Sequence, residues 1–332
     1  MQTLTSLEAI SLRPIDNWGE VQPVLESQLT QPGMIYQPFV ERRKLNEFLL
    51  LRAAQTLHSR EAISVLAQVD GVVCGLSCWS TLAWDSKMYG FPAAKLDFLL
   101  ASGEDAEEIK RSLLDETIEG ARNMRIRHLI ARADADDHST MRVLEESKFE
   151  IIDGIQTLSL RLPANLNGWH DSDNAPETRL FEEGDLAKVL EIARSSYVFD
   201  RFHTDSAIAK ATADRINEAW LANSCNGNAA DAVLVAVDGP VVLGYATCKI
   251  DRETREGLGV SFGTIVMVAT TANARNRGVG QACTAAAIRW FQNQNVDVVL
   301  VGTQLRNIPA ARLYEKCGFR TISNTVTLRK VL

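Results

Sequence analysis

An arginine- and glycine-bearing turn in the C-terminal half of the chain is the segment best suited to chemistry. An apolar stretch, Ser261–Ala269, runs through a polar loop into the turn RNRGVG at residues 275–280, where a helical pattern starts. The free backbone N–H groups of a first helical turn bind anions, and glycines let a ligand approach the backbone. Each arginine would add charge-assisted hydrogen bonds of about 1.5–3 kcal/mol. The turn therefore predicts a phosphate site.

Two common phosphate loops do not fit this turn. A P-loop requires Gly-Lys-Ser/Thr, whereas Gln-Ala follows the last glycine here. A dinucleotide loop requires G-x-G-x-x-G and an acidic residue at the tip of the next strand, but the third position is Cys283 and the strand Val296–Thr303 ends without a carboxylate. A third pattern, R/Q-x-x-G-x-G/A, matches Arg275, Gly278 and Gly280. An ordinary strand–turn–helix connection with surface arginines would also explain the turn taken alone.

Length and composition restrict the class of protein. The chain has 332 residues, enough for two domains, and its hydrophobic (46%) and charged (23%) fractions are typical of a soluble globular protein. The net charge of −7 argues against nucleic acid or an anionic membrane as a partner, and neither a secretory signal nor a membrane-spanning run is visible. The six cysteines form no C-x-x-C pair and the five histidines have no metal-ligand spacing. We therefore expect a cytoplasmic protein with reduced thiols and no metal site.

Matching segments indicate that the chain repeats one design. The segment Val65–Cys78 parallels Val233–Cys248, and each is predicted to be a β-hairpin with a central Asp-Gly turn. At nearly the same offset, the segment ending in Lys-Phe149 parallels the segment ending in Gly-Phe319. Two matches at one offset predict tandem copies of one domain.

The two copies predict an α/β fold in which each domain has a mixed, mostly antiparallel central sheet flanked by helices. The first domain would cover residues 1–162 and the second residues 177–332. Residues 163–176 are polar and rich in Pro, Asn and Gly, as in a linker. In the second domain, the helix Val279–Asn293 has an apolar face that should pack on the sheet.

Several ordered elements of the second domain resemble the GCN5-related N-acetyltransferase (GNAT) superfamily. The resemblance rests on the phosphate turn, the strand ending in Gln304 and the pattern N-x-x-A-x-x-x-Y-x-x-x-G-F at residues 307–319, and it covers about residues 261–332. It implies an enzyme that transfers an acetyl group from acetyl-CoA to the primary amine of a small molecule. The cofactor-binding residues that it implies are Val266, Val268, Arg275, Arg277, Gly278, Val279, Gly280 and Asn307.

The resemblance also implies how these residues act. The backbone of Val266 and Val268 would pair with the pantetheine arm as an added strand, while the turn binds the pyrophosphate. Asn307 would contact the arm, and its place before a helix start equally fits an N-cap. Tyr314 would be the general acid for the leaving thiolate, because a phenol with a pKa near 10 keeps its proton at neutral pH. The strand Ser261–Ala269 carries no carboxylate, so the general base is left open.

The acceptor is predicted from weaker signals. Stretches around the candidate residues resemble superfamily members that acetylate a nucleotide-linked amino sugar. An amino acid, a peptide N-terminus or an antibiotic amine is the alternative acceptor, and a non-catalytic acyl-CoA-binding protein is a third hypothesis. The sequence leaves open whether the chain forms a homodimer. The candidate acceptor residues are Arg201, Phe202, Trp220, Trp84 and Tyr89. Helix packing is the favoured interpretation of Trp220, whereas Trp84 and Tyr89 fit a core and turn cluster equally well.

The first copy lacks the residues of a second acetyl-CoA site. Its counterpart of the phosphate turn, residues 101–108, has one glycine, no arginine and four carboxylates. Leu144 stands where Tyr314 does, and Asp137 stands where Asn307 does. We therefore expect the first domain to be a scaffold without an acetyl-CoA site.

Overall fold

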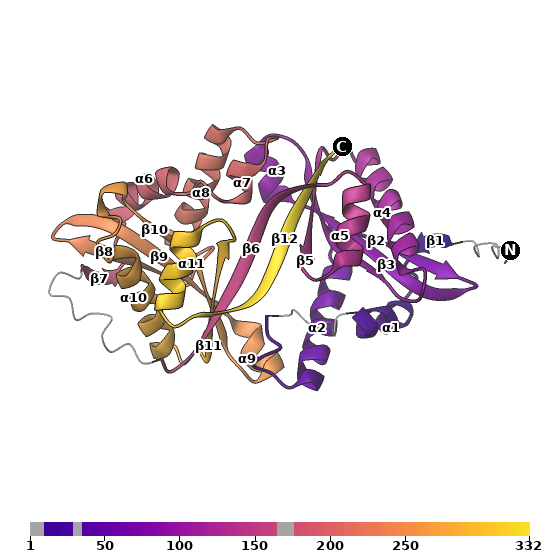
Figure 1. Cartoon of the computed structure of the whole chain (residues 1–332), viewed down its shortest axis with the longest axis horizontal. Coiled ribbons are helices and arrows are strands. Elements are labelled where there is room, and N and C mark those ends of the chain that lie inside the picture. The colour runs from indigo at the N-terminus through magenta and orange to yellow at the C-terminus, as the bar shows by residue number, and fades with distance from the viewer. Residues whose placement is uncertain (1–9, 29–34, 165–175) are drawn as a thin grey trace. The chain divides into compact units, whose positions relative to one another are not determined.

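The computed structural model describes residues 10–28, 35–164 and 176–332 (Figure 1). The chain divides into two compact units, each discontinuous in sequence. The N-terminal unit consists of Met1–Gln37, Glu41–Ile152 and Thr325–Leu332, and the C-terminal unit consists of Pro38–Val40 and Asp153–Asn324. The predicted linker, residues 163–176, lies almost entirely outside the described residues, so its conformation stays a prediction.

The N-terminal unit contains one sheet with strand order β1-β2-β3-β4-β5-β12. Its recorded strand pairs are antiparallel except the parallel pair β4–β5. Its strands are β1 (Ser11–Pro14), β2 (Ala62–Val69), β3 (Val72–Thr81), β4 (Ala93–Ala101), β5 (His128–Asp134) and the last part of β12 (Arg320–Val331). Its helices are α1 (Trp18–Gln28), α2 (Arg42–Leu57), α3 (Ala83–Tyr89), α4 (Ala106–Asn123) and α5 (His138–Glu146).

The C-terminal unit contains the equivalent strand order β7-β8-β9-β10-β11-β6. Its parallel pair is β10–β11, which corresponds to β4–β5. Its strands are most of β6 (Glu150–Arg161), then β7 (Glu177–Leu180), β8 (Ala232–Asp238), β9 (Val241–Asp251), β10 (Phe262–Thr270) and β11 (Val298–Gln304). Its α-helices are α6 (Leu186–Ser196), α7 (Arg201–Thr204), α8 (Lys210–Cys225), α9 (Arg252–Leu258), α10 (Val279–Asn293) and α11 (Ile308–Lys316).

Helices cover both faces of the C-terminal sheet because its strands are apolar on both sides. Along β8, Leu234 and Ala236 face the core cluster that contains α10 and α11. The alternating residues Val233 and Val235 face a second cluster that contains α6 and α8. Successive side chains of a strand point to opposite faces, so one apolar run feeds both cores. The predicted fold class, a mostly antiparallel mixed sheet flanked by helices, is confirmed.

The last strand of each predicted copy completes the sheet of the other unit. Residues 155–161 of β6 end the first copy, yet they pair with β11 in the C-terminal unit. Residues 325–331 of β12 end the second copy, yet they pair with β5 in the N-terminal unit. Neither sheet is therefore built from one contiguous stretch of chain. Among the described helices, none combines the length and apolar character needed to cross a membrane.

Candidate active site

Strand β10 separates from β11 halfway along its length. The parallel pairing ends at Ile265, and a bulge interrupts the pairing with β9 between Ile265 and Met267. The N–H of Met267 donates to Thr247 Oγ1 on β9 over 3.0 Å. Val268 follows Met267, so its backbone groups point to the opposite edge, beyond the end of the β11 pairing. The bulge interrupts this alternation at Val266. Val268 thus lies where an extended ligand could pair with the strand, and the pairing of Val266 with pantetheine stays a prediction.

The predicted phosphate turn joins β10 to α10 with an uncapped helix N-terminus. Gly278 is the N-cap residue with φ 77°, a left-handed conformation that glycine adopts without strain, and no side chain caps the helix. The first intrahelical N–H is that of Ala282, which donates to Gly278 O over 2.9 Å. Arg275 and Arg277 are exposed and form no ion pair within the described residues. The first turn therefore presents free N–H groups and two cations to solvent, as an anion site requires.

Helix α11 packs against this turn and carries the candidate acid. The space beside Gly280 is filled by Leu313 of α11, whose Cδ2 would lie 3.2 Å from a β-carbon at Gly280. The next residue, Tyr314, belongs to the same core cluster as Val279 of α10. The structure thus brings the turn and the phenol together on one side of the sheet.

Tyr314 is more enclosed than its predicted role suggests. It is 5% exposed, and its ring meets Phe319 edge-on at a centroid distance of 6.0 Å. Burial raises the pKa of Tyr314 well above its ordinary value, so the phenol keeps its proton at neutral pH. Within the described residues its hydroxyl has no hydrogen-bond partner. The hydroxyl oxygen is not one of the fully buried side-chain atoms that lack a partner, so it retains some accessible surface and is a donor available to a ligand.

Two further tyrosines form a hydrogen-bonded pair that sequence patterns did not reveal. The hydroxyls of Tyr197, which follows α6, and Tyr245 on β9 are 3.1 Å apart. Burial, then the neighbouring Tyr245 and Tyr314, raise the pKa of Tyr197 well above its ordinary value. No motif surrounds Tyr197, so only the folded chain reveals the group.

Asn307 is a helix N-cap, as one of its two sequence interpretations predicts. Its side chain accepts a hydrogen bond from the Ala310 N–H over 3.3 Å at the start of α11. The preceding residue, Arg306, places its guanidinium 5.6 Å from the centre of the Phe199 ring. Contact of Asn307 with pantetheine stays a prediction, and capping does not exclude it.

The candidate acceptor residues of the C-terminal unit are only partly exposed. Arg201 and Phe202 lie together in α7, with the guanidinium 4.5 Å from the ring centre. Phe202 is 4% exposed, so it offers no open face for stacking on a base or sugar. Trp220 packs against the cluster between the sheet and α6 and α8, as core packing predicts.

Trp84 and Tyr89 belong to the N-terminal unit. Trp84 is 38% exposed, and the Tyr89 hydroxyl donates to Asp85 Oδ1 over 3.2 Å within α3. Their proposed contact with the acceptor stays a prediction.

The N-terminal copy has a buried lysine at the position that corresponds to Gly280 of the phosphate turn. The two copies share one helix–sheet contact. Ile109 of α4 packs on Gly75 of β3, and Val279 of α10 packs on Gly244 of β9. The residue that follows is Lys110 in one copy and Gly280 in the other. Lys110 is 6% exposed, and its ammonium donates to Thr140 Oγ1 over 2.8 Å. At the position that corresponds to Gly280, the N-terminal copy thus has a buried lysine whose ammonium contacts the first turn of α5.

This geometry can be set beside known proteins. Residues 186–319 match the family model described as "Acetyltransferase (GNAT) family". These residues are a GNAT domain. The protein is an acyltransferase of the GNAT type, and the matched region contains β10, the phosphate turn and Tyr314.

Other known proteins are similar to most of the chain, beyond this GNAT domain. The chain is 25% identical to the spore coat polysaccharide biosynthesis protein SpsD of Bacillus subtilis (strain 168) over 84% of its length and 91% of that protein. A tandem GNAT protein from the clavulanic acid biosynthesis pathway shares the fold with a TM-score of 0.58, at 15% identity over 97% of this chain and 98% of that chain. A GCN5-related N-acetyltransferase from Sphaerobacter thermophilus shares it with a TM-score of 0.60, at 15% identity over 97% and 95%.

Proposed function

We propose that the C-terminal unit is an acetyl-CoA-dependent N-acetyltransferase that acts on the primary amine of a small molecule. The observation that carries the proposal is the hydroxyl of the largely buried Tyr314, which has no partner among the described residues; the Tyr314 side chain shares a cluster with the uncapped start of α10. A non-catalytic acyl-CoA-binding protein would need the turn but not a protonated phenol beside it.

In this proposal each residue has one task. The backbone of Val266 and Val268 holds the pantetheine arm, and the turn at residues 275–280 binds the pyrophosphate. Bound acetyl-CoA supplies a thioester, whose acetyl group passes to the amine nitrogen as the carbon–sulfur bond breaks. The Tyr314 hydroxyl gives its proton to the departing sulfur, and the nitrogen releases one proton to solvent. General acid assistance of this kind contributes about 10²–10⁴-fold in rate.

For the acceptor we propose a nucleotide-linked amino sugar. The likeness to SpsD, which is named for polysaccharide biosynthesis, supports a sugar. The stretches Leu82–Gly90, Asp200–Phe202 and Thr303–Tyr314 resemble TDP-fucosamine N-acetyltransferase. That enzyme has a truncated N-terminal half-domain, whereas the N-terminal copy is full length here. Arg201 would meet a nucleotide phosphate. A cytoplasmic location, which the six free cysteines favour, stays a prediction.

Thiol release from acetyl-CoA in the presence of a panel of amines tests the proposal. The panel contains nucleotide-linked amino sugars, amino acids, peptides with a free N-terminus and aminoglycosides. We expect release with an amino sugar nucleotide. Release with another class alone would overturn the acceptor but keep the reaction. Tight binding of acetyl-CoA without release with any amine would support a binding protein instead.

A further inference from the structure

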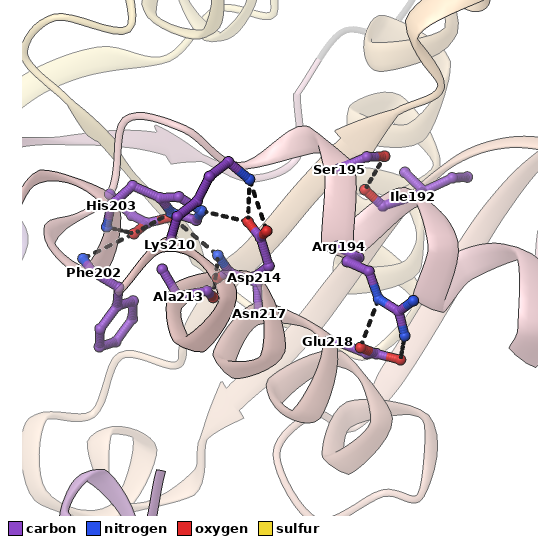
Figure 2. Close-up of polar contacts among 11 residues, drawn as sticks. Ile192, Arg194, Ser195, Phe202, His203, Lys210, Ala213, Asp214, Asn217 and Glu218 are labelled. Atoms are coloured by element: carbon purple, nitrogen blue, oxygen red, sulfur yellow. Dashed lines mark hydrogen bonds and ion pairs between the residues drawn. The ribbon is translucent and has the colours of Figure 1, made fainter. Parts of the chain in front are cut away.

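Helix α7 is fastened to α8 by an imidazole held between two carboxylates. His203 Nδ1 lies 2.9 Å from Asp200 Oδ2, and His203 Nε2 lies 2.9 Å from Asp214 Oδ1 (Figure 2). The His203 side chain is 6% exposed. Each ring nitrogen thus lies within hydrogen-bond distance of a carboxylate.

The surrounding groups complete this cluster. Lys210 Nζ lies 2.7 Å from Asp214 Oδ2, and the Asn217 side chain donates to Asp200 Oδ2 over 3.1 Å. Burial raises the pKa of Asp214, but hydrogen bonds from Lys210 and His203 outweigh this and leave it lowered. Hydrogen bonds to charged groups contribute about 1.5–3 kcal/mol, and unpaired buried charges are costly. These hydrogen bonds therefore form together only when α7 is held in this position against α8.

Helix α7 needs such an attachment because it is a single turn. Its span is Arg201–Thr204, and isolated helices of this length are unstable in water. Asp200 also caps it, accepting hydrogen bonds from the N–H groups of Phe202 and His203. The same carboxylate thus starts the helix and binds the imidazole, which ties the shape of α7 to its attachment on α8.

The segment before α7 touches the candidate active site at three points. Ser196 Oγ donates to the carbonyl of Thr270, the last residue of β10, over 3.3 Å. Tyr197, whose pKa is raised by burial and in part by Tyr314, pairs with Tyr245, and Phe199 meets Arg306 before α11. Residues 196–204 therefore run from the end of the cofactor-binding strand to the His203 cluster.

We propose that His203 is a positioning residue for the acceptor. By clamping α7 between Asp200 and Asp214, it holds residues 196–204 as one wall of the acceptor site beside Tyr314. This inference rests on the proposed function, because it assigns the wall to the acceptor of that reaction. The proposal separates acceptor binding, which depends on the clamp, from acetyl-CoA binding, which depends on the turn before α10.

The variant His203→Gln tests the clamp, and Arg194→Gln is its matched control. Arg194 forms a bidentate ion pair with Glu218, at 2.6 and 2.9 Å, which joins α6 to the same helix α8 (Figure 2). For the amine with the fastest thiol release, we expect His203→Gln to raise the acceptor KM about 10- to 100-fold, the loss typical of a charge-assisted hydrogen bond. Its KM for acetyl-CoA should change less than about twofold, and Arg194→Gln should change neither constant. Equal effects of the two variants, or an equal rise in both KM values, would overturn the proposal.

Hydrogen exchange gives a readout that does not depend on turnover. In His203→Gln we expect faster exchange of residues 197–204, with α10 unchanged, and no such increase in Arg194→Gln. Unchanged exchange at residues 197–204 would contradict the clamp even if the enzyme is active. If the clamp is seen but no amine gives thiol release, the clamp stands as a structural feature while the proposed function and the acceptor role fail together.

Discussion

Leu313 of α11 would lie 3.2 Å from a β-carbon on Gly280, at the first turn of α10. This contact joins the helix that carries Tyr314 to the turn that is proposed to bind pyrophosphate. A β-carbon here would need Leu313 to move by a few tenths of an ångström and would stand where the ligand approaches the backbone.

The variant Gly280→Ala should therefore weaken acetyl-CoA binding with little loss of stability. Alanine favours a helix over glycine by about 1 kcal/mol, which offsets the tight contact with Leu313. We expect a dissociation constant about tenfold higher by calorimetric titration, and a free energy of unfolding within about 1 kcal/mol of the parent. Unchanged affinity would argue that the ligand does not approach this turn.

Removal of the Tyr314 hydroxyl should impair turnover without harming the fold. The hydroxyl has no partner among the described residues, so Tyr314→Phe leaves no broken hydrogen bond and should keep the melting temperature. We expect kcat to fall about 10²–10⁴-fold while the affinity for acetyl-CoA is retained. If kcat survives at the parent value, the assignment of the acid is wrong.

Calorimetric titration should find one acetyl-CoA per chain. The N-terminal copy has the buried Lys110 where the other copy has Gly280, and Leu144 where the other has Tyr314. A second, equivalent site per chain would contradict the proposed scaffold role of this copy. Gly280→Ala should weaken the single site and reveal no remaining one.

Stability should fall in alkaline solution because of buried thiols. Burial raises the pKa of Cys283 and of Cys317 from near 9 to about 12. Above pH 9 the unfolded chain releases these protons while the folded chain keeps them, so the free energy of unfolding is intact below pH 9 and declines toward pH 12. Each thiol contributes about 1.4 kcal/mol per pH unit. Urea denaturation at pH 8 and pH 10.5 measures this decline in the free energy of unfolding. The decline should be smaller in Cys317→Ala, which lacks one of the two thiols. An equal decline in this variant would show that the Cys317 thiol does not cause it.

Local patterns predicted the elements around the candidate site. The helix Val279–Asn293 has the predicted bounds, because its apolar spacing and the preceding glycine are signals within one segment. The N-cap role of Asn307 could be predicted for the same reason, since the cap and its helix are adjacent in sequence.

Features that depend on distant segments could not be predicted. The pairing of Tyr197 with Tyr245 and the clamp of His203 by Asp214 arise only when α6, α7, α8 and β9 are assembled. Periodicity does not say which sheet a strand joins, so the pairing of the last residues of β12 with β5 could not be predicted. Phe202 was predicted as a candidate acceptor residue, yet it is buried, and its burial depends on how α7 is held.

The crossing of β6 and β12 makes the two copies mutually dependent. A cut at residues 163–176 would take β6 from the catalytic half and leave β11 with an unpaired edge, while the other half would lose the partner of β5. Neither half could then be inherited, expressed or exchanged as a separate module. Loss of the N-terminal copy, which we expect to be a scaffold, would also remove a strand from the sheet that carries the proposed acetyl-CoA site.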